Sequence, residues 1–329
     1  MPELQDKMLA ILGDSRFYSD ESLAQRLGVS LKEIATQYQR LESLGLSLEF
    51  EKGRGYRLPG NVELLSNEII RHHLESADDP RVSLCDLQIF RTIDSTNRYA
   101  REQAGGADLT GSVILSESQS AGRGRLGKVW ESPFAANIYM SVIWRFETGA
   151  KALQGLSLAV GVAVRRSLVD LGVVGIQLKW PNDIYCDGKK LGGILLEMIG
   201  DPSGECTVII GLGLNVSMPH IAAQEINQPW TDLQTVAPFA VSRNVLVASL
   251  IKSLFKVLGD FPECGFAGYR DEWQSADLLK GSQGTVSNPS GSISGTILGV
   301  DSVGALRMQL ASGEEQRFIG GELSLRGNL

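Results

Sequence analysis

The sequence lacks the segments that would carry it into or across a membrane. No apolar run approaches the roughly 18 to 20 residues that a helix needs to span a bilayer. The first seven residues have neither the basic stretch nor the apolar stretch of a secretory signal. Hydrophobic residues make up 43% and charged residues 21%, which are ordinary values for a globular chain. We therefore expect a cytoplasmic protein with no membrane partner.

Cysteine and histidine are both scarce. The cysteines form no CxxC pair and no metal-ligand spacing, so we expect them to be small buried side chains. They are Cys85, Cys186, Cys206 and Cys264. The histidines belong to no Ser–His–Asp or Cys–His arrangement. They are His72, His73 and His220. The sequence therefore gives no sign of a nucleophilic triad, and we predict no metal site built from protein side chains.

Positive charge is also in short supply. The chain has 31 Lys and Arg against 38 Asp and Glu, a net charge of −7. The segment 1–66 has eight basic and ten acidic side chains, which gives it a charge of −2. This balance argues against a protein that coats nucleic acid through bulk charge. It leaves a small local basic surface open.

The 329 residues exceed what one hydrophobic core usually serves, and the pattern changes twice along the chain. Short helical patterns and two short strands occupy 1–66. Longer strands and helices in mixed order follow over 67–276. Gly and Ser then become frequent between short alternating segments over 277–329, where a small β-barrel fits best. We predict an α+β protein with an N-terminal winged helix-turn-helix, a central mixed α/β domain and a C-terminal β-barrel.

The winged helix-turn-helix prediction rests on capping residues and on a hairpin. Asp20 can cap one helix, and Ser30 with Glu33 forms a capping box for the next. Strands expected at 46–50 and 56–59 then flank a Gly-rich turn. The second helix and the hairpin offer side chains for a few DNA contacts. These are Ser30, Lys32, Thr36, Gln37, Arg40, Lys52 and Arg54. We predict DNA binding aided by dimerisation; the alternative is a domain that helps only an enzyme.

Alternating and apolar patterns predict the elements of the central domain. Strands are expected at 112–116, 137–146, 177–180, 191–199 and 206–211. Helices are expected at 151–171, 241–258 and 266–274. The helix over 151–171 is apolar on nearly every side, so we expect other elements to cover most of its faces.

A Gly- and Arg-rich loop over 119–130 is the strongest local signal. Three of its glycines match GxGxxG, but Pro133 and the next strand leave no room for the helix that a dinucleotide site needs. The same loop matches GxxxxGK, but Val129 stands where a phosphate loop needs a hydroxyl. A third interpretation is an anion clamp in which Arg123 and Arg125 are planar donors. The alternative is a solvated basic loop.

Two more strand ends carry polar side chains. Lys179 ends an apolar strand just before Trp-Pro-Asn-Asp, so we expect it to face a carboxylate or a phosphate. A lysine at a sheet edge that reaches for solvent is the alternative. Asn215 ends the segment Gly-Leu-Gly-Leu-Asn, where it could contact a purine or shape a turn.

Together with Asp94-Ser-Thr-Asn97, these segments make the chain similar to the bifunctional biotin–protein ligases and biotin-operon repressors of bacteria. The resemblance covers the whole length. It runs from the winged helix through GRGRLG, KWPND and the strand Lys190–Glu197 to GLGLN and Gly320–Arg326. Several motifs in one order are more specific than any one alone.

The resemblance implies that ATP, with Mg²⁺, activates biotin to biotinyl-5'-AMP, and that biotin is then transferred to a lysine of a biotin carboxyl carrier protein. It implies an SH3-like C-terminal barrel and an adenylate-bound homodimer that represses at a biotin operator. The implied catalytic residues are Lys179 and Arg125. The implied biotin-binding residues are Ser95, Thr96, Asn97, Gln119, Arg123, Gly124, Arg125 and Lys179. The implied nucleotide-binding residues are Arg123, Arg125, Lys128, Trp130, Asn182, Asn215 and Trp230.

Two alternatives to this function stay open: a DNA-binding biotin sensor without ligase activity, and a lipoate-type ligase. The chain also departs from the family pattern GRGRRGR. It has Leu126 and Lys128 in the loop, which removes one charge and exchanges a guanidinium fork for a point charge. We expect this to affect adenylate affinity and the strength of the dimer.

Overall fold

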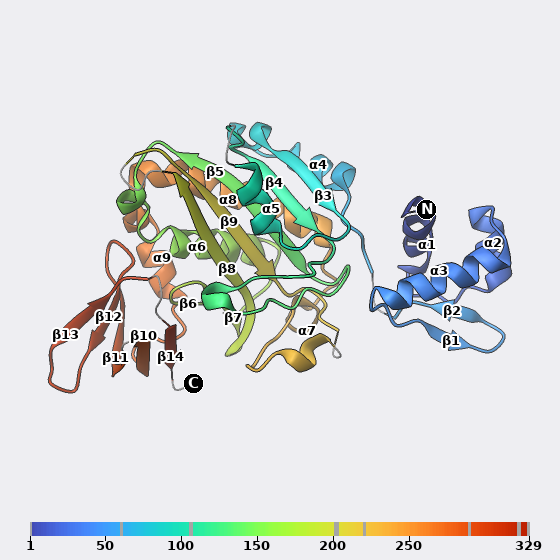
Figure 1. The fold of residues 1–329 in the computed structure, drawn as a ribbon. Helices are drawn as coiled ribbons and strands as arrows, with labels where there is room; N and C mark the ends of the chain where they lie inside the picture. Colours follow the sequence, from blue (N-terminus) through green and yellow to red (C-terminus); the bar gives the residue numbers. More distant parts are fainter. Residues whose placement is uncertain are drawn as a thin grey trace.

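The computed structural model of the chain describes residues 2–59, 62–104, 108–200, 204–219, 222–288, 291–320 and 324–327. His220 lies outside the described residues, as do parts of the predicted Gly320–Arg326 motif. In Figure 1 the described elements form a large central sheet with a small helical unit at its N-terminal side and a second sheet at its C-terminal side. No helix among the described residues has both the length and the apolar character needed to cross a bilayer.

The N-terminal unit contains three helices and a two-stranded antiparallel sheet, drawn in blue in Figure 1. Its elements are α1 (Pro2–Leu12), α2 (Asp20–Leu27), α3 (Leu31–Ser43), β1 (Glu49–Glu51) and β2 (Gly55–Arg57). The predicted capping box of Ser30 and Glu33 is confirmed. The predicted cap at Asp20 is wrong, because Ser19 accepts the hydrogen bond from Ser22 and Asp20 is the first helical residue. The hydrophobic cluster of this unit also includes Phe134 and Ala135 from the central part of the chain.

The central sheet has seven described strands in the order β3-β4-β5-β9-β8-β7-β6. All neighbours are antiparallel except β3 and β4. The strands are β3 (Asp86–Phe90), β4 (Ser112–Ser116), β5 (Ile138–Phe146), β6 (Ile176–Lys179), β7 (Asp183–Cys186), β8 (Lys189–Gly200) and β9 (Cys206–Leu214). The helices are α4 (Asn67–Leu74), α5 (Thr96–Gln103), α6 (Leu156–Asp170), α7 (Leu233–Val236), α8 (Arg243–Cys264) and α9 (Arg270–Ser275).

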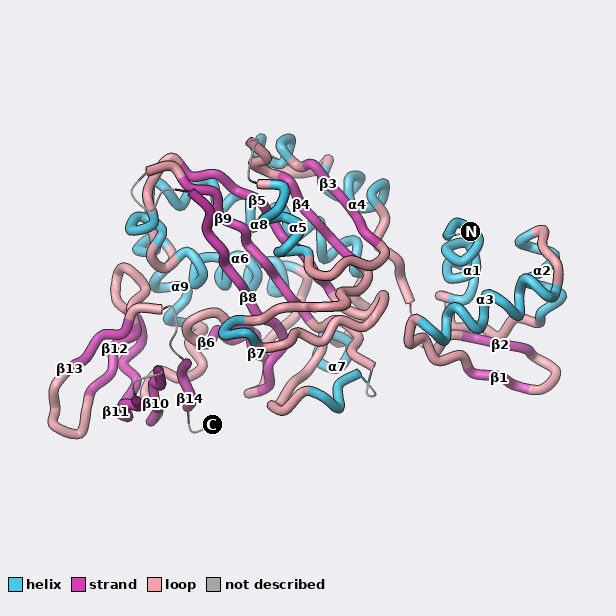
Figure 2. Tube along the Cα trace, in the orientation of Figure 1, coloured by secondary structure: helices cyan, strands magenta, loops and turns pink. Residues whose placement is uncertain are grey.

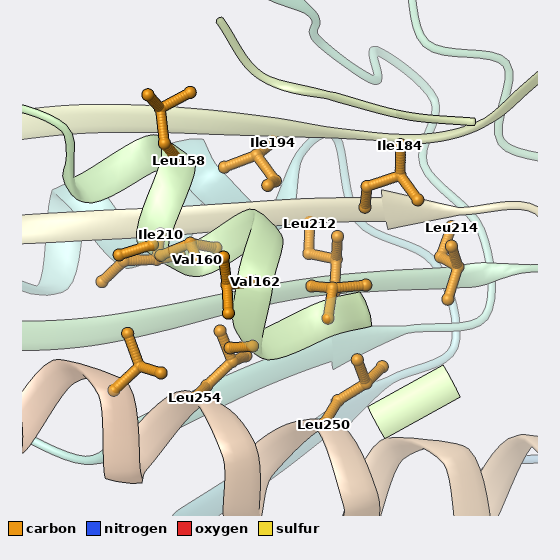
Figure 3. Packing of buried hydrophobic residues seen from close by; sticks show 14 of the residues in the cluster. Leu158, Val160, Val162, Ile184, Ile194, Ile210, Leu212, Leu214, Leu250 and Leu254 are labelled. Carbon is orange, nitrogen blue, oxygen red and sulfur yellow. The ribbon is translucent and has the colours of Figure 1, made fainter. Parts of the chain in front are cut away.

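The two faces of this sheet differ, because successive side chains on a strand point to opposite sides. On β5 and β9 the even-numbered residues, such as Val142 and Ile210, join the main core beneath α6 and α8. Figure 3 shows this packing, with Val160 and Val162 of α6 lying between the strands and Leu254 of α8. The helix α6 is buried on most faces, as its sequence predicts.

On the opposite face of the sheet, the odd-numbered Ile143 and Ile209 pack with Ala100 of α5 in a small separate cluster. The helix α5 covers only part of this face. The odd positions of β9 beyond Ile209 are glycines, so no side chains project from this face of the strand there. This surface becomes the floor of the site described below.

The C-terminal sheet has five described strands in the order β13-β12-β11-β10-β14, coloured magenta in Figure 2. They are β10 (Gln283–Asn288), β11 (Gly291–Val300), β12 (Leu306–Gln309), β13 (Glu315–Phe318) and β14 (Ser324–Gly327). Their buried residues belong to the main core, so this sheet packs on the central part of the molecule. The segment after α9 continues that contact, because Ala276 and Leu278 exchange backbone hydrogen bonds with Leu178 of β6.

One prediction about cysteine is wrong. Cys85, Cys186 and Cys206 are buried, but Cys264 is exposed, because it is the last residue of α8 and lies where the helix leaves the core. The predicted helix over 151–171 also starts later than expected, at Leu156. Gly155 has a φ of +78°, which breaks the helical path before that residue.

Candidate active site

Three glycines on neighbouring strands form the floor of a cavity of about 490 Å³. Gly211 and Gly213 of β9 face the cavity, and Gly193 of β8 pairs with Gly213. A Cβ atom on Gly211 would lie 2.2 Å from the Asn97 Oδ1, and one on Gly213 would lie 2.4 Å from the Trp130 ring. These contacts are shorter than van der Waals distance, so only glycine lets the two side chains rest on the sheet.

The N-terminus of α5 places the Ser-Thr-Asn segment on this floor. Ser95 caps the helix, and Thr96 and Asn97 form its first turn, all three nearly fully buried. The Ser141 hydroxyl of β5, which is fully buried, lies 2.8 Å from the Thr96 Oγ1 and 2.6 Å from the Asn97 Oδ1. The Gln119 carboxamide oxygen accepts a hydrogen bond of 2.9 Å from the Thr96 backbone N–H. Hydroxyls and amides thus converge without buried charge.

Asn97 is placed differently from the other residues of its segment. One Nδ2 contact goes to the Leu195 carbonyl at 3.2 Å and another to the Glu197 Oε2 at 2.9 Å. The amide group has two N–H donors, and both therefore have protein acceptors. The predicted contact of Asn97 with biotin stays a prediction, and both N–H donors of its amide already have protein acceptors. Asn97 lines the cavity, but its hydrogen bonds hold α5 on the sheet.

A buried ion pair fixes the strand end that carries Gln119. The Arg243 guanidinium at the start of α8 lies 2.7 Å from the Glu117 carboxylate, and both side chains are almost fully buried. Glu117 also accepts from the Leu65 backbone N–H at 2.6 Å. Arg243 donates to the Asn137 carbonyl, so the start of β5 joins the same network. Because a buried charge is costly unless it is paired and hydrogen-bonded, this network holds β4 in one position.

The Gly- and Arg-rich loop closes over the cavity as a tight β-like turn. The Gly124 N–H donates to the Lys128 carbonyl and the Trp130 N–H donates to the Gly122 carbonyl. A Cβ atom on Gly122 would lie 2.3 Å from the Trp130 carbonyl oxygen, so this glycine is required. The described loop contains one short 3₁₀ turn at Arg125–Gly127 before β5 and no α-helix. The exclusion of a dinucleotide fingerprint is therefore confirmed.

The two loop arginines have different surroundings. Arg125 donates a hydrogen bond of 2.9 Å to the Asn182 Oδ1, and burial lowers the pKa of its guanidinium although Asp183 opposes that shift. Asn182 is itself held by the Ile194 carbonyl at 2.8 Å. Arg123 is half exposed, and its Nη1 lies 3.7 Å from the Glu197 carboxylate.

Lys179 lines the cavity at the end of β6, as the sequence predicts. Its Nζ donates to the Tyr185 hydroxyl at 3.3 Å and lies 5.1 Å from the centre of the Tyr185 ring. Burial lowers the pKa of the Lys179 ammonium, and the nearby Asp183 carboxylate partly offsets this. Among the described residues no carboxylate forms a salt bridge with Lys179, and a half-buried cation of this kind in a cavity is suited to an anionic ligand.

Two cavity residues that carry charge were missed. Lys190, the second residue of β8, forms an ion pair of 2.8 Å with Asp183 of β7. The two side chains are 15% and 21% exposed. The sequence offered a signal, since Lys190 directly precedes the apolar run 191–196. Arg326 of β14 also lines the cavity, so the C-terminal sheet contributes a second unexpected cation.

Most of the predicted ligand residues meet in this one cavity, but two do not line it. Its lining includes Ser95, Thr96, Asn97, Gln119, Arg123, Gly124, Arg125, Lys128, Trp130, Lys179 and Asn182. Asn215 is buried, and its Nδ2 donates to the Thr231 carbonyl, which is the turn-shaping role. Trp230 lies beside Lys190, because the backbones of 229–231 and Lys190 exchange two hydrogen bonds.

Comparison of the sequence with known proteins identifies the family of this chain. The model of the biotin/lipoate A/B protein ligase family matches residues 89–215, and that of the biotin protein ligase C terminal domain matches residues 285–326. The bifunctional ligase/repressor BirA of Escherichia coli (strain K12) is 35% identical over 320 residues, which cover 97% of this chain and 96% of that protein. The chain belongs to the biotin/lipoate A/B protein ligase family.

The relative of the same name from Salmonella typhimurium is also 35% identical, over 97% of this chain. Among solved structures, the biotin protein ligase from Aquifex aeolicus in complex with biotin and ATP has a TM-score of 0.64 and 28% identity. That match covers 74% of this chain and 99% of the other. This chain therefore has the mixed α+β biotin protein ligase fold with a C-terminal β-sheet domain.

The residues predicted to contact DNA lie away from the ligase cavity, in the N-terminal unit. Lys32 is exposed at the start of α3. Gln37 is only 3% exposed and lies in the core of the unit, so it does not reach a DNA surface in this conformation. Arg54 is paired with Glu51 at 2.8 Å and lies over the Phe17 ring. The Thr36 hydroxyl donates a hydrogen bond to the Lys32 carbonyl. The remaining predicted contacts are Ser30, which caps α3, Arg40 and Lys52.

Proposed function

We propose that this cavity is where the chain, a biotin–protein ligase, joins biotin to ATP. The observation that carries the proposal is that one cavity has a neutral polar floor around Thr96 and Gln119 and, along its lining, the cations Lys179, Lys190 and Arg125. The neutral groups suit the urea ring of biotin, since hydroxyls and amides can both donate and accept. The cations suit its carboxylate and the phosphates of ATP.

The first step is attack of the biotin carboxylate oxygen on the α-phosphorus of ATP, and pyrophosphate leaves. In the second step the amine of a carrier lysine attacks the carbonyl carbon of biotinyl-5'-AMP, an amide bond forms, and AMP leaves with the electrons of the broken C–O bond. Neither step needs a protein nucleophile. We assign Lys179, Lys190 and Arg125 to hold the carboxylate and α-phosphate together and to stabilise the charge that develops there.

Magnesium would enter with ATP. Among the described residues no group of three or more His, Cys, Asp and Glu could hold a metal ion. Mg²⁺ prefers oxygen ligands and keeps several waters, so ATP phosphates and water would supply most of its ligands, with Asp183 as a carboxylate in the cavity. Its chemistry there would be to neutralise phosphate charge.

The chain also acts as a repressor, as relatives named bifunctional ligase/repressor indicate. We propose three domains: a winged helix-turn-helix over 1–66, the ligase domain over 67–276 and an SH3-like barrel over 277–329. We further propose a cytoplasmic protein, an adenylate-bound homodimer as the species that binds a biotin operator, and a biotin carboxyl carrier protein as acceptor. The capping box and exposed Lys32 of α3 support the DNA role. Because 1–66 has a charge of −2, we expect dimerisation to aid the affinity for DNA.

The test is pyrophosphate exchange into ATP with the purified chain, with and without biotin, followed by labelling of a purified carrier protein. We expect exchange to depend on biotin and label to appear on a single carrier lysine. Lipoate is the competitor, because the matching family model covers biotin and lipoate ligases. Exchange driven by lipoate but not by biotin would overturn the biotin assignment. Binding of biotin with no exchange and no labelled carrier would contradict the ligase function and support the alternative of a biotin sensor.

A further inference from the structure

Glu197 of β8 contacts two segments that are far from it in the sequence, the helix α5 and the Gly- and Arg-rich loop. Its Oε2 accepts the hydrogen bond of 2.9 Å from the Asn97 Nδ2. Its Oε1 lies 3.7 Å from Arg123 of the loop and 3.7 Å from Arg101 of α5. The carboxylate is 16% exposed, whereas the two arginine side chains are 51% and 57% exposed. Glu197 is thus the most buried member of this group of charges.

The contact with Asn97 extends to the floor of the cavity. Asn97 already rests against the sheet, because its Oδ1 lies only 2.2 Å from the position that a Cβ of Gly211 would take. Its Oδ1 also lies 2.6 Å from the Ser141 hydroxyl, which lies 2.8 Å from the Thr96 Oγ1. The Thr96 backbone N–H in turn donates to the Gln119 carboxamide oxygen. Hydrogen bonds therefore connect Glu197, residue by residue, to the polar groups that line the cavity.

The two sides of the Glu197 carboxylate differ in strength. The bond to Asn97 has a normal length and lies among nearly buried groups, where leaving the Asn97 N–H without an acceptor would be costly. The arginine contacts are long and half exposed, where ion pairs contribute little. The side chain therefore acts mainly through its reach to Asn97, and only weakly through its charge.

We propose that Glu197 is a positioning residue for biotin binding, which orients Thr96 and Gln119 through Asn97 and Ser141 while touching no substrate itself. The inference rests on the proposed function. When the bond from Glu197 is lost, Asn97 can rotate, Ser141 loses a fixed partner, and the floor is no longer preorganised for the urea ring. Such a loss weakens substrate binding and leaves the chemical step intact.

Two conservative variants separate reach from charge. Glu197→Gln keeps the length of the side chain and an oxygen that accepts from Asn97, but it removes the charge. Glu197→Asp keeps the charge but is shorter by one methylene, so it loses the bond to Asn97. Glu205 supplies the matched control, because it forms an exposed ion pair with Arg145 just before β9 and does not line the cavity.

The measurement is biotin-dependent pyrophosphate exchange, from which the KM for biotin and kcat are read separately. We expect Glu197→Asp to raise the KM for biotin about tenfold with kcat within about twofold of the wild type, and Glu197→Gln to stay within about threefold in both. Glu205→Asp and Glu205→Gln should match the wild type. The reverse order, with Gln worse than Asp, would show that charge matters and would overturn the proposal.

A double-variant cycle supplies a second criterion. If Glu197 acts through Asn97, Asn97→Ala combined with Glu197→Asp should raise the KM for biotin no more than Asn97→Ala alone. Additive effects would overturn the proposal. Wild-type protein that shows no biotin-dependent exchange would contradict the proposed function instead, so the two failures are distinguishable.

Discussion

At the residue scale, the site depends on the absence of side chains at two positions of β9. At Gly211 and Gly213, the Asn97 amide and the Trp130 ring occupy the space that a side chain would fill, whereas a Cβ at Gly193 would make only an ordinary contact of 3.5 Å. These glycines have ordinary strand conformations, so close approach rather than backbone freedom explains them.

Gly211→Ala should therefore disable the site. The added methyl group would lie 2.2 Å from the Asn97 Oδ1, and Asn97 has no room to retreat while it bonds to Leu195 and Glu197. We expect the Kd for biotin, measured by titration calorimetry, to rise at least about thirtyfold. Gly161→Ala is the control, because a Cβ there makes only an ordinary contact of 3.4 Å with Leu178 and alanine suits the interior of α6. Equal affinity of the Gly211 variant and the control would refute this account of the floor.

The cations make a second residue-scale prediction. Lys190→Ala should lower kcat for pyrophosphate exchange by about 10² to 10³, because it removes one preorganised positive charge and leaves Asp183 unpaired beside the phosphates. Lys189→Ala is the matched control, since the neighbouring side chain is exposed and does not line the cavity. Single-turnover rates of adenylate formation would measure both. A Lys190 variant as fast as the Lys189 variant would remove Lys190 from the reaction.

Residue patterns predicted part of this site. Lys179 and Arg125 could be found because a cation at the end of an apolar strand and an arginine between glycines are unusual. Lys190 and Asp183 were missed because each resembles an ordinary strand end until the hairpin β7–β8 brings them together. The hydrogen bonds that Asn97 makes to Leu195 and Glu197 join residues about a hundred positions apart, so no local pattern could reveal them.

At the element scale, the edge strand β6 pairs with the segment 276–278, which leads into the C-terminal sheet. Leu178 bonds to Ala276 and Leu278, and the next residue along β6 is Lys179. Between them Asp277 is mostly buried; its Oδ1 accepts from the Leu279 N–H at 3.0 Å, while its Oδ2 has no hydrogen-bond partner among the described residues. Burial raises the pKa of this carboxyl to about 6, although Lys280 opposes the shift.

Asp277→Asn should stabilise the protein in a manner that depends on pH. The pKa is higher in the folded than in the unfolded state, so the carboxyl destabilises the fold increasingly as pH rises from the unfolded value of about 4 to about 6, and by a constant amount above that. Asn keeps the acceptor for Leu279. We expect a gain of about 1 to 3 kcal/mol in the free energy of unfolding at pH 8 that vanishes below about pH 3, where the carboxyl is protonated in both states. Urea unfolding at several pH values measures it, with the exposed Asp271→Asn as control; a gain independent of pH would contradict the burial argument.

Element boundaries show how far sequence patterns reach. The strand at 112–116 was predicted at its observed bounds, because five apolar or small residues lie between turn signals. The helix expected from 151 starts at Leu156, because the left-handed Gly155 fits against Phe266 and the Val303 carbonyl of distant segments. Local periodicity cannot register such a contact.

At the scale of the whole molecule, the N-terminal unit and the ligase part share packed residues. Phe134 and Ala135, which follow the loop at 122–130, are buried in the hydrophobic cluster of the N-terminal unit. Arg91 forms an ion pair with Asp6 of α1 and lies 5.0 Å from the centre of the Phe134 ring. The order of the three parts was predictable from composition and turn signals. Their packing was not, because Phe134 looks like any apolar loop residue until its partners are in place.

The most direct test of the central claim needs no carrier and no DNA. The wild-type chain is mixed with biotin and ATP, and the reaction is quenched with acid. The products are then separated and quantified by mass spectrometry. The account predicts biotinyl-5'-AMP and pyrophosphate in equal amounts, near one adenylate per chain, with far less from the Lys179→Ala variant. Biotin bound by a folded chain that forms no adenylate would contradict the account.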